Sequence, residues 1–339
     1  MRILIIGAQG STHVGGSLFR AATKLGHEPR LCDINQAWQY GRLWQRVLWH
    51  WGGRRPARLG AFCRQILATC DTFRPDVLIA TGMAPVTATI LQGCRAKKIP
   101  AANFSTDDPF SRISRRAGWF LQALREYDVV FSPRRANLTE LEQHGCRAVK
   151  YLPFAYDSDL FFPEPAAAGM ASDLLFAGQA DRERVPFLSA ARKAGFQVRL
   201  YGDGWNAHPA TRGISLGQAD TPTLRRAISA CRVALGGVRH VNRDGNSMRT
   251  FEIPAVGACL LAEDTAEHRE IYGAEGECVL YYQTPEEMVT QTKTLLADPR
   301  LREQLKSQVY QRITQGHHTY GDRLQAMLAE LERGKPKPG

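Results

Sequence analysis

Short apolar runs alternate with amphipathic stretches along the whole chain. In the first half, six runs rich in Val, Ile, Leu and Phe predict strands, which span residues 2–8, 28–34, 76–82, 101–106, 128–133 and 149–154. Strands that are apolar throughout are typical of a parallel sheet with helices on both faces. The amphipathic stretches between them, such as 16–26 and 88–98, predict those helices. Residues 1–160 are therefore expected to form an α/β domain with a parallel sheet.

The pattern stops at FFPEPAAAGMASD, residues 161–173, and then starts again. This stretch is rich in Pro, Ala and Gly and has no periodicity, which predicts a linker. Beyond it, five more apolar runs predict strands, within residues 173–178, 197–204, 233–238, 258–264 and 278–282. A helix is expected from Thr221, and three more helices are expected at about 285–333.

This order of elements predicts an α/β protein of two Rossmann-like domains facing a cleft. The second domain spans residues 172–316, and a last helix at 317–333 is expected to cross back to the first domain. In sheets of this kind, ligands bind beyond the carboxyl ends of the strands. The loops that follow the strands are therefore where functional residues are expected.

Composition limits the class of protein. The chain has 339 residues, enough for two domains, and its 44% hydrophobic and 23% charged residues are ordinary for a globular protein. No apolar run approaches the ~18 residues of a membrane-spanning helix, and the opening MRILIIGAQG suits a strand better than a signal peptide. The eight cysteines form no CxxC pair, so reduced thiols in a cytoplasmic protein are expected, without structural zinc.

The net charge of +11 is unevenly placed. Residues 1–160 carry 22 Lys and Arg against 12 Asp and Glu, while the rest of the chain carries 22 against 21. The first domain is therefore expected to meet something anionic, and the alternative is an ordinary basic surface.

A tryptophan- and arginine-rich stretch lies within this basic half. Residues 38–60 hold four of the six tryptophans and five arginines but no acid. Such a stretch suits a helix at a membrane interface or beside a lipid-linked phosphate, and the alternative is a helix that is part core and part solvated. Nucleic acid is a less favoured partner, because the chain has no apparent recognition fold.

Two loops of the first domain carry candidate residues. In GAQGSTHVGGS, Gly16 lies near a helix N-terminus, whose free N–H groups suit an anion. The glycine spacing does not follow GxGxxG, so a dinucleotide site with Asp33 on the ribose is only weakly indicated, and a plain turn is the alternative. In FSTDDPF, a metal pair of Asp107 and Asp108 is disfavoured, because adjacent residues diverge and no third ligand is near. Contact with sugar hydroxyls is as plausible as a metal, and a turn before proline is the alternative.

Three loops of the second domain suit an anion or a nucleobase. FAGQADRERVPFL places Gly178 at a turn and both Arg182 and Arg184 at a helix start. Cations there oppose the helix dipole unless an anion binds, so this loop predicts a phosphate site, with a solvated arginine pair as the alternative. Gly202 and Gly217 lie in two further strand-end loops that could flank a base. The chain has no GxSxG motif and no P-loop, which disfavours hydrolases of that type and NTPases.

The stretch DGNSMRTFEIPAVGACLLAED, residues 244–264, holds a carboxylate just ahead of a buried strand. Glu252 is therefore either a solvated residue at a helix start or a group aimed at a ligand. If the helix begins near Glu252, its dipole favours the carboxylate, and Pro254 falls in the first turn, where proline is tolerated. Arg249 would lie on the same face and hold Glu252 or a phosphate.

Taken together, these motifs resemble the retaining GT-B glycosyltransferases of the group 1 type, and within them the CgeB-like (spore maturation protein) branch. The family carries an E-x7-E motif whose second Glu heads EAMACGxPVVA, and EIPAVGACLLA fits it from Glu252 onward. The first acid is Asp244 here, so the chain departs from the motif as D-x7-E. FAGQADRER matches the phosphate loop, with Arg184 at the lysine position and Gln179 in place of the arginine. The resemblance is close over 172–325 and looser over the first domain.

The resemblance implies a second domain that binds a nucleotide sugar and a first domain that binds the acceptor. It assigns Glu252 to the ribose hydroxyls of a nucleoside diphosphate sugar, the co-substrate, and it implies neither a cofactor nor a metal. The donor-binding candidates are Gly16, Gly178, Arg182, Arg184, Gly202, Gly217, Arg249 and Glu252, and the catalytic candidates are Asp107, Asp108 and Asp244. Cationic side chains and backbone N–H groups would neutralise the leaving group, and no nucleophile is assigned.

The acceptor is expected to be an anionic small molecule, lipid-linked molecule or polymer, with peripheral contact at the inner face of a membrane. Three different functions stay open beside glycosyl transfer. A GT-B epimerase would use a sugar nucleotide without an acceptor. A relative that only binds sugar nucleotides would fit the departures at Asp244 and Gln179. An NAD-dependent dehydrogenase is less favoured.

Overall fold

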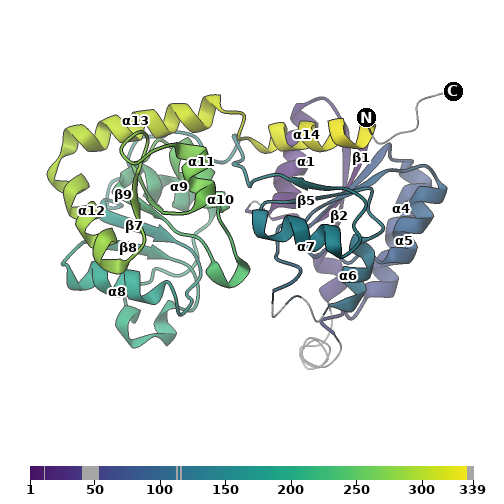
Figure 1. The fold of residues 1–339 in the computed structure, drawn as a ribbon, viewed down its shortest axis with the longest axis horizontal. Coiled ribbons are helices and arrows are strands. Elements are labelled where there is room, and N and C mark those ends of the chain that lie inside the picture. The colour runs from purple at the N-terminus through teal and green to yellow at the C-terminus, as the bar shows by residue number, and fades with distance from the viewer. Residues whose placement is uncertain (11, 40–52, 112–113, 115–116, 334–339) are drawn as a thin grey trace. The chain divides into compact units, whose positions relative to one another are not determined.

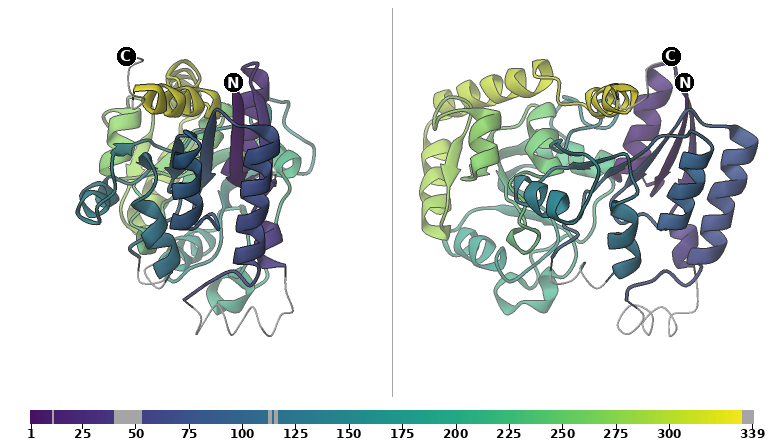
Figure 2. Two further views of the ribbon diagram at one scale, coloured as in Figure 1. Left: turned by 90° about the vertical axis from the view of Figure 1, so that its right-hand side faces the viewer. Right: turned by 45° about the vertical axis from the view of Figure 1, so that its right-hand side comes forward.

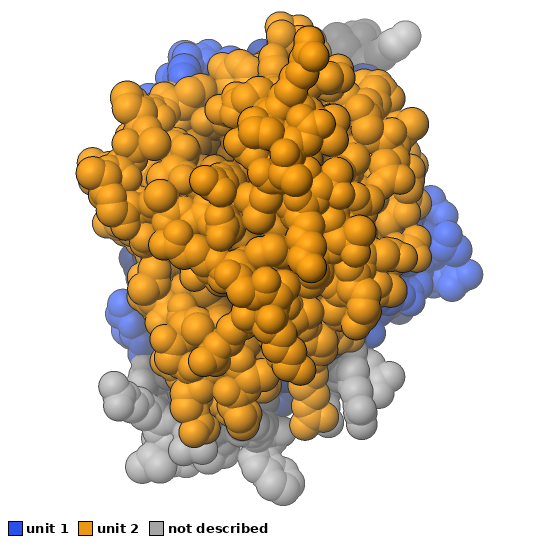
Figure 3. Space-filling model, turned by 90° about the vertical axis from the view of Figure 1, so that its left-hand side faces the viewer, with its two compact units in different colours: residues 1–153, 241–243, 320–339 blue, residues 154–240, 244–319 orange. Residues whose placement is uncertain are grey.

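The computed structural model describes residues 1–10, 12–39, 53–111, 114 and 117–333, and the chain divides into two compact units (Figures 1 and 3). Unit 1 comprises residues 1–153, 241–243 and 320–339, and unit 2 comprises residues 154–240 and 244–319. Residues 40–52, most of the tryptophan- and arginine-rich stretch, lie outside the described part. Among the helices that are described, none is both long enough and apolar enough to span a membrane.

Unit 1 contains a parallel sheet of six strands in the order β2-β1-β3-β4-β5-β6. The strands are β1 Arg2–Gly7, β2 Glu28–Asp33, β3 Val77–Thr81, β4 Ala101–Phe104, β5 Val129–Ser132 and β6 Val149–Tyr151. Each of the six predicted strands is therefore present, and β6 is shorter than predicted. Strands β1 and β3 are apolar and almost wholly buried, as expected for a sheet covered on both faces.

Helices cover both faces of this sheet (Figure 2). They are α1 Val14–Lys24, α2 Asn35–Trp38, α4 Leu59–Phe73, α5 Ala88–Ala96, α6 Gly118–Leu124, α7 Leu138–Gln143 and α14 Tyr320–Arg333. Helices α1 and α14 pack against each other, and α14 also contacts β4 and β5. Helices α4, α5 and α6 share one apolar core with Leu4, Ile6 and Leu78 of the sheet. The last helix of the chain thus belongs to unit 1.

The glycines after β1 allow helix α1 to pack closely against the strand. A Cβ atom on Gly7 would lie 2.8 Å from the Cα atom of Gly15, and one on Gly16 would lie 2.6 Å from the carbonyl oxygen of Gly10. Neither distance is possible for a real side chain. Close packing alone therefore accounts for these glycines, and the assignment of Gly16 to the donor stays a prediction.

Unit 2 contains a second parallel sheet, of five strands in the order β11-β10-β9-β7-β8. The strands are β7 Ser172–Ala177, β8 Val198–Tyr201, β9 Cys231–Gly236, β10 Leu260–Glu263 and β11 Leu280–Tyr282. The helices are α8 Val185–Lys193, α9 Thr221–Ala230, α10 Met248–Ala255, α11 Ala266–Tyr272, α12 Pro285–Ala297 and α13 Pro299–Gln315. All five predicted strands and the predicted closing helices are present.

The strand order of unit 2 reverses at β7. Strand β8 lies on one side of β7 and β9 on the other, so the loops that leave these central strands diverge. In open parallel sheets such a reversal opens a crevice beyond the carboxyl ends of the strands. The loops after β7 and β9 are therefore the expected borders of a binding site in this unit.

The predicted linker has no helix or strand between residues 161 and 171, but side chains of unit 2 hold it. Arg225 of α9 donates to Glu164 at 3.0 Å and to the carbonyl oxygen of Leu160 at 2.8 Å, and its guanidinium stacks over the ring of Phe162. One arginine thus orders a segment that lacks secondary structure.

The eight cysteines, all within the described residues, are free thiols, as predicted.

The placement of Pro254 in the first turn of its helix was wrong. Helix α10 begins earlier, at Met248, so Glu252 is its fifth residue and Pro254 lies inside the helix. The start is fixed by Ser247, whose N–H donates to the hydroxyl oxygen of Thr250 at 2.9 Å. Because proline has no N–H, the carbonyl of Thr250 lacks its helical donor. The hydroxyl of buried Tyr272 donates to that carbonyl at 2.6 Å instead.

Tyr272→Phe should destabilise the protein by about 1–3 kcal/mol, because it leaves a buried carbonyl without a donor. The free energy of unfolding in urea measures this loss. Tyr310→Phe, which removes a hydroxyl from the half-buried face of α13, is the matched control and should have little effect. Equal stability of both variants and the wild type would mean that water or another donor replaces Tyr272.

Candidate functional site

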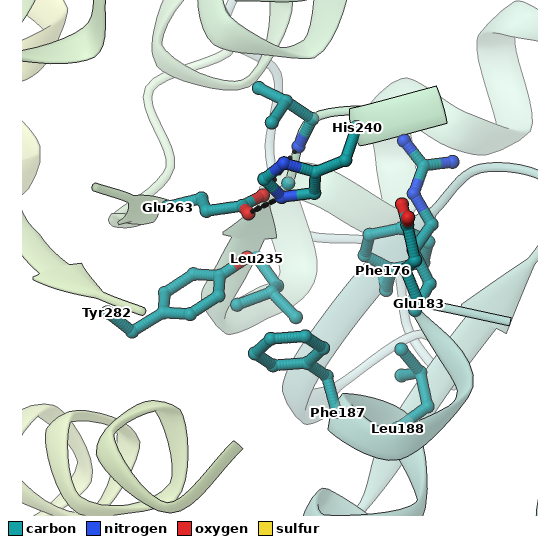
Figure 4. Close-up of a pocket in the computed structure, with 11 residues that line it drawn as sticks. Phe176, Glu183, Phe187, Leu188, Leu235, His240, Glu263 and Tyr282 are labelled. Carbon is teal, nitrogen blue, oxygen red and sulfur yellow. Dashed lines mark hydrogen bonds and ion pairs between the residues drawn. The ribbon is translucent and has the colours of Figure 1, made fainter. Parts of the chain in front are cut away.

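Polar side chains that follow or end four different strands converge at the carboxyl edge of the unit 2 sheet (Figure 4). Arg184 follows β7, His240 follows β9, Glu263 ends β10 and Tyr282 ends β11. With an apolar wall that includes Phe176, they line a cavity of about 20 Å³. A single water fits such a volume, so a larger ligand would contact the polar rim rather than enter the cavity.

Arg184 provides a largely buried positive charge to this pocket. Its side chain is 13% exposed, and Nη1 donates to the carbonyl oxygen of Gln179 at 3.2 Å. Burial lowers the pKa of Arg184, and the nearby charge of Arg239 lowers it further, while Asp181 and Asp244 act in the opposite direction. The guanidinium remains charged at neutral pH, because the ordinary pKa of arginine lies far above neutrality.

Sequence reasoning missed Asp181, which stands in the same loop. Its Oδ1 accepts hydrogen bonds from the backbone N–H groups of Glu183 at 3.1 Å and Arg184 at 2.8 Å, just before α8. This carboxylate offsets the cations that the sequence placed at the helix start. Arg182 is exposed and does not line the pocket, so the structure brings only one of the two predicted arginines there. An Asp three residues ahead of Arg184 is the capping signal that could have revealed it.

The structure brings together the three predicted glycines of unit 2, Gly178, Gly202 and Gly217. A Cβ atom on Gly202 would lie 2.0 Å from the carbonyl oxygen of Gly178, and its φ of +126° excludes other residues. The N–H of Gly178 donates to Tyr201 at 3.0 Å, and the N–H of Gly202 donates to Gly217 at 2.8 Å. These glycines hold the loops after β7 and β8 in contact, and their role toward a donor stays a prediction.

Glu252 and Arg249 form the predicted pair on α10. Arg249 Nη1 donates to Glu252 Oε2, and the Glu252 side chain is only 4% exposed. A buried carboxylate is stabilised by such a charged donor. The pair therefore presents a positioned carboxylate and a partly exposed guanidinium on a single helix.

Asp244 lies in a loop whose backbone is tightly held. Its N–H donates to the carbonyl oxygen of Arg239 at 3.1 Å. The next residue, Gly245, accepts from the Thr265 hydroxyl at 2.6 Å, and Asn246 Oδ1 accepts from the backbone N–H of Phe154 at 3.1 Å. Since the charge of Asp244 acts on Arg184, the structure places the first acid of D-x7-E near the predicted phosphate-loop cation.

The two neighbouring acids of unit 1 have different surroundings. Asp107 is exposed, whereas Asp108 is buried. Asp108 accepts from Arg243 Nε at 2.8 Å and from Asn137 Nδ2 at 2.9 Å. Burial opposes ionisation of Asp108, but the hydrogen bonds from Arg243, a backbone N–H and Asn137 prevail and lower its pKa. Asp108 thus holds Arg243 in place, and sequence reasoning missed Arg243. The catalytic role of Asp108 stays a prediction.

Nothing in the described part of the chain groups three or more His, Cys, Asp or Glu side chains as a metal site would. Asp107 and Asp108 do not belong to such a group, since the Asp108 oxygens already accept from side chains and from the N–H of Phe110.

A second hollow, of about 440 Å³, lies along α13 and is lined by Glu277, Cys278 and Arg312 among others. It lies away from the carboxyl ends of the strands, and no candidate from the sequence lines it.

Sequence reasoning also missed the two histidines that adjoin β10. His268 is buried, and burial lowers its pKa, so the neutral ring is favoured. Its Nδ1 donates to the carbonyl oxygen of Glu263 at 2.6 Å, and its Nε2 contacts the Thr250 hydroxyl at 2.9 Å. This chain of contacts ties the start of α10 to β10. His240 contacts the carboxylate of the same Glu263.

Known proteins are similar to this chain in sequence over residues 182–329 and in fold over nearly its whole length. Residues 182–329 match the model of a family described as glycosyl transferase-like. A comparison with curated proteins finds no match. Among solved structures, the chain is similar to a sucrose-phosphate synthase from Thermosynechococcus elongatus, with 14% identity, a TM-score of 0.68 and 98% of each chain covered.

Two further solved structures are similar over nearly the whole chain. HepE from Anabaena, in complex with UDP-glucose, has 14% identity and a TM-score of 0.67, with 99% of this chain and 100% of HepE covered. A putative UDP-N-acetylglucosamine 2-epimerase from Listeria monocytogenes has 12% identity and a TM-score of 0.57, with 99% and 98% covered. Together with the two parallel sheets, these likenesses give the chain the GT-B fold.

Proposed function

We propose that this chain is a glycosyltransferase that takes its sugar from a nucleoside diphosphate sugar. The glycosyl transferase-like match over residues 182–329 supports the reaction class. The GT-B fold shared with HepE, whose structure contains UDP-glucose, supports a uridine nucleotide as the first candidate donor. The match includes six of the eight donor candidates, Arg182, Arg184, Gly202, Gly217, Arg249 and Glu252.

The observation that carries the proposal is the grouping of charges in unit 2. Arg184 and Asp244 come from the loops after β7 and β9, which border the point where the strand order reverses. On the helix that follows, Glu252 is a buried carboxylate held by Arg249. A carboxylate accepts two hydrogen bonds from a vicinal diol, and guanidinium groups bind phosphates, so the set suits a ribose and a diphosphate.

The reaction would break the bond between the anomeric carbon and the diphosphate oxygen and join that carbon to an acceptor oxygen. The diphosphate leaves with the bonding electrons, and the acceptor proton passes to a phosphate oxygen. Arg184 and Arg249 would neutralise the leaving group in place of a metal. Retention of the anomeric configuration is proposed from the group 1 resemblance, and no protein nucleophile is assigned.

The acceptor is proposed to be anionic or held at an anionic membrane surface. Residues 1–160 carry 22 Lys and Arg against 12 Asp and Glu, and this half supplies nearly all of unit 1. A surface of one charge attracts the opposite charge and raises its local concentration. This supports an acceptor such as a phosphorylated small molecule, a lipid-linked phosphate or an anionic polymer.

An epimerase is the second candidate function. The likeness to a putative UDP-N-acetylglucosamine 2-epimerase favours it over a dehydrogenase and over a relative that only binds sugar nucleotides. Product analysis separates epimerisation from glycosyl transfer. An epimerase converts UDP-N-acetylglucosamine alone into an isomeric sugar nucleotide. A glycosyltransferase releases UDP in step with transfer to an acceptor, and a relative that only binds would do neither.

Glu252→Gln and Arg184→Gln should each weaken UDP binding by about 1–3 kcal/mol, because each removes charged hydrogen bonds to the ligand. Isothermal titration calorimetry with UDP measures the change, and thermal melting checks that both variants fold. Glu286→Gln and Arg226→Gln, at exposed positions of α12 and α9, are the matched controls. Wild-type affinity in both site variants would remove these two residues from the donor site.

Transfer activity should persist in excess EDTA, because arginines rather than a metal are proposed to neutralise the diphosphate. UDP release with and without EDTA measures this, once a donor and an acceptor are in hand. Complete loss of activity that Mg²⁺ or Mn²⁺ restores would contradict the proposal. It would direct attention to Asp107 and Asp108.

The protein should sediment with anionic vesicles more than with neutral ones, and the difference should fade as salt rises, because ions screen surface charge. Co-sedimentation with phosphatidylglycerol and phosphatidylcholine vesicles at low and high salt measures this. Equal binding to both vesicle types, together with no preference for a phosphorylated acceptor over its neutral analogue, would leave the basic half as ordinary surface.

A further inference from the structure

Glu263 is a buried carboxylate whose two oxygens are both engaged (Figure 4). Oε2 accepts from the backbone N–H of Val238 at 2.8 Å, and Oε1 contacts His240 Nε2. An ionised carboxylate only accepts hydrogen bonds, so the Nε2 atom of His240 carries a proton. Each oxygen of Glu263 therefore already has a partner within the protein, and the carboxylate holds His240 in place.

The contact between Glu263 and His240 leaves one ring nitrogen of the imidazole for a ligand. The His240 side chain is 57% exposed, whereas the Glu263 side chain is 11% exposed. With Nε2 held by the carboxylate, Nδ1 is the ring atom that can meet a molecule at the pocket. Nδ1 accepts a hydrogen bond when the imidazole is neutral and donates one when it is protonated.

The cations beside the pocket favour an anionic ligand. Arg184 lines the same cavity, and its pKa is lowered first by burial and then by the positive charge of Arg239. An anion near these cations would relieve their mutual repulsion. The groups that face the site with a negative or titratable side chain are Glu183 from the start of α8, Glu263 from β10, Tyr282 from β11 and Asp244 from the loop after β9.

We propose that His240, positioned by Glu263, donates its Nδ1–H to a phosphate oxygen of the nucleoside diphosphate. The inference rests on the proposed glycosyl transfer and adds a residue to that site. During transfer the bond between the anomeric carbon and the diphosphate oxygen breaks, and its electrons stay on the diphosphate. The acceptor proton ends on a phosphate oxygen, while His240 keeps its own proton and contributes a hydrogen bond. His240 touches the substrate, and Glu263 acts through His240.

Calorimetric titrations with UDP, uridine and inorganic pyrophosphate test this inference between about pH 5.5 and 8, where an ordinary imidazole changes charge. The proteins are the wild type, His240→Gln, Glu263→Gln and a control, His208→Gln, at a half-buried histidine of the same unit outside the pocket. Thermal melting of each variant shows whether it is folded.

His240→Gln should weaken UDP and pyrophosphate binding about tenfold or more at the acid end of the range and leave uridine binding unchanged. This loss should shrink toward pH 8, because only the protonated imidazole carries an Nδ1–H besides the Nε2–H that Glu263 holds. Glu263→Gln should also weaken UDP and pyrophosphate binding, because it removes the partner that positions His240. A residue that only packs against the pocket would show no such dependence on pH.

Three results would overturn the inference: UDP affinity in His240→Gln equal to the wild type, an equal loss of uridine binding, or the same dependence of UDP affinity on pH in the two proteins. If the wild type binds no UDP, the proposed function fails, and pyrophosphate still decides the role of His240. Pyrophosphate bound by the wild type and lost in His240→Gln supports an anion site there, and any other pyrophosphate result rejects it.

Discussion

Parallel strands all end at the same edge of a sheet, and the candidate site in unit 2 depends on this constraint. Because β7, β9, β10 and β11 run in one direction, residues that are about a hundred positions apart in sequence lie at the same edge of the sheet. Arg184, His240 and Glu263 come from three different strand ends and line one pocket. The reversal of strand order at β7 then separates the bordering loops and leaves room beyond the sheet.

Some features near this edge could be predicted from the sequence, and others could not. The strands were predictable because buried parallel strands are apolar throughout, and β7 and β9 were read from such runs. The Arg249 and Glu252 pair was predictable from helical spacing alone. The position of Pro254 was not, because its helix depends on Tyr272, a residue on α11 that supplies the missing donor. A pattern in one segment carries no information about a partner that only folding brings near.

Single polar residues in loops were the hardest to assign. His240 and Glu263 both stand at strand ends, but neither belongs to a recurrent spacing, since their contact spans 23 positions of sequence. The contact of Asp108 with Arg243 could not be predicted, because Arg243 lies 135 positions later in the chain. Asp181 had a local signal, because an Asp shortly before a helix is a typical capping residue. The prediction was based on the neighbouring arginines instead. The first two cases required three-dimensional contacts, and the third did not.

The contact between Gly202 and Gly178 bears on how chains with this fold can be aligned. The similar solved structures are only 12–14% identical to this chain, so most positions differ. Position 202 has no such freedom, because any Cβ atom there would meet the carbonyl oxygen of Gly178 at 2.0 Å while the backbone keeps a φ of +126°. A chain that keeps these two loops as close must keep this glycine whatever it binds. Gly202 is therefore a fixed point for setting alignment register, independent of function.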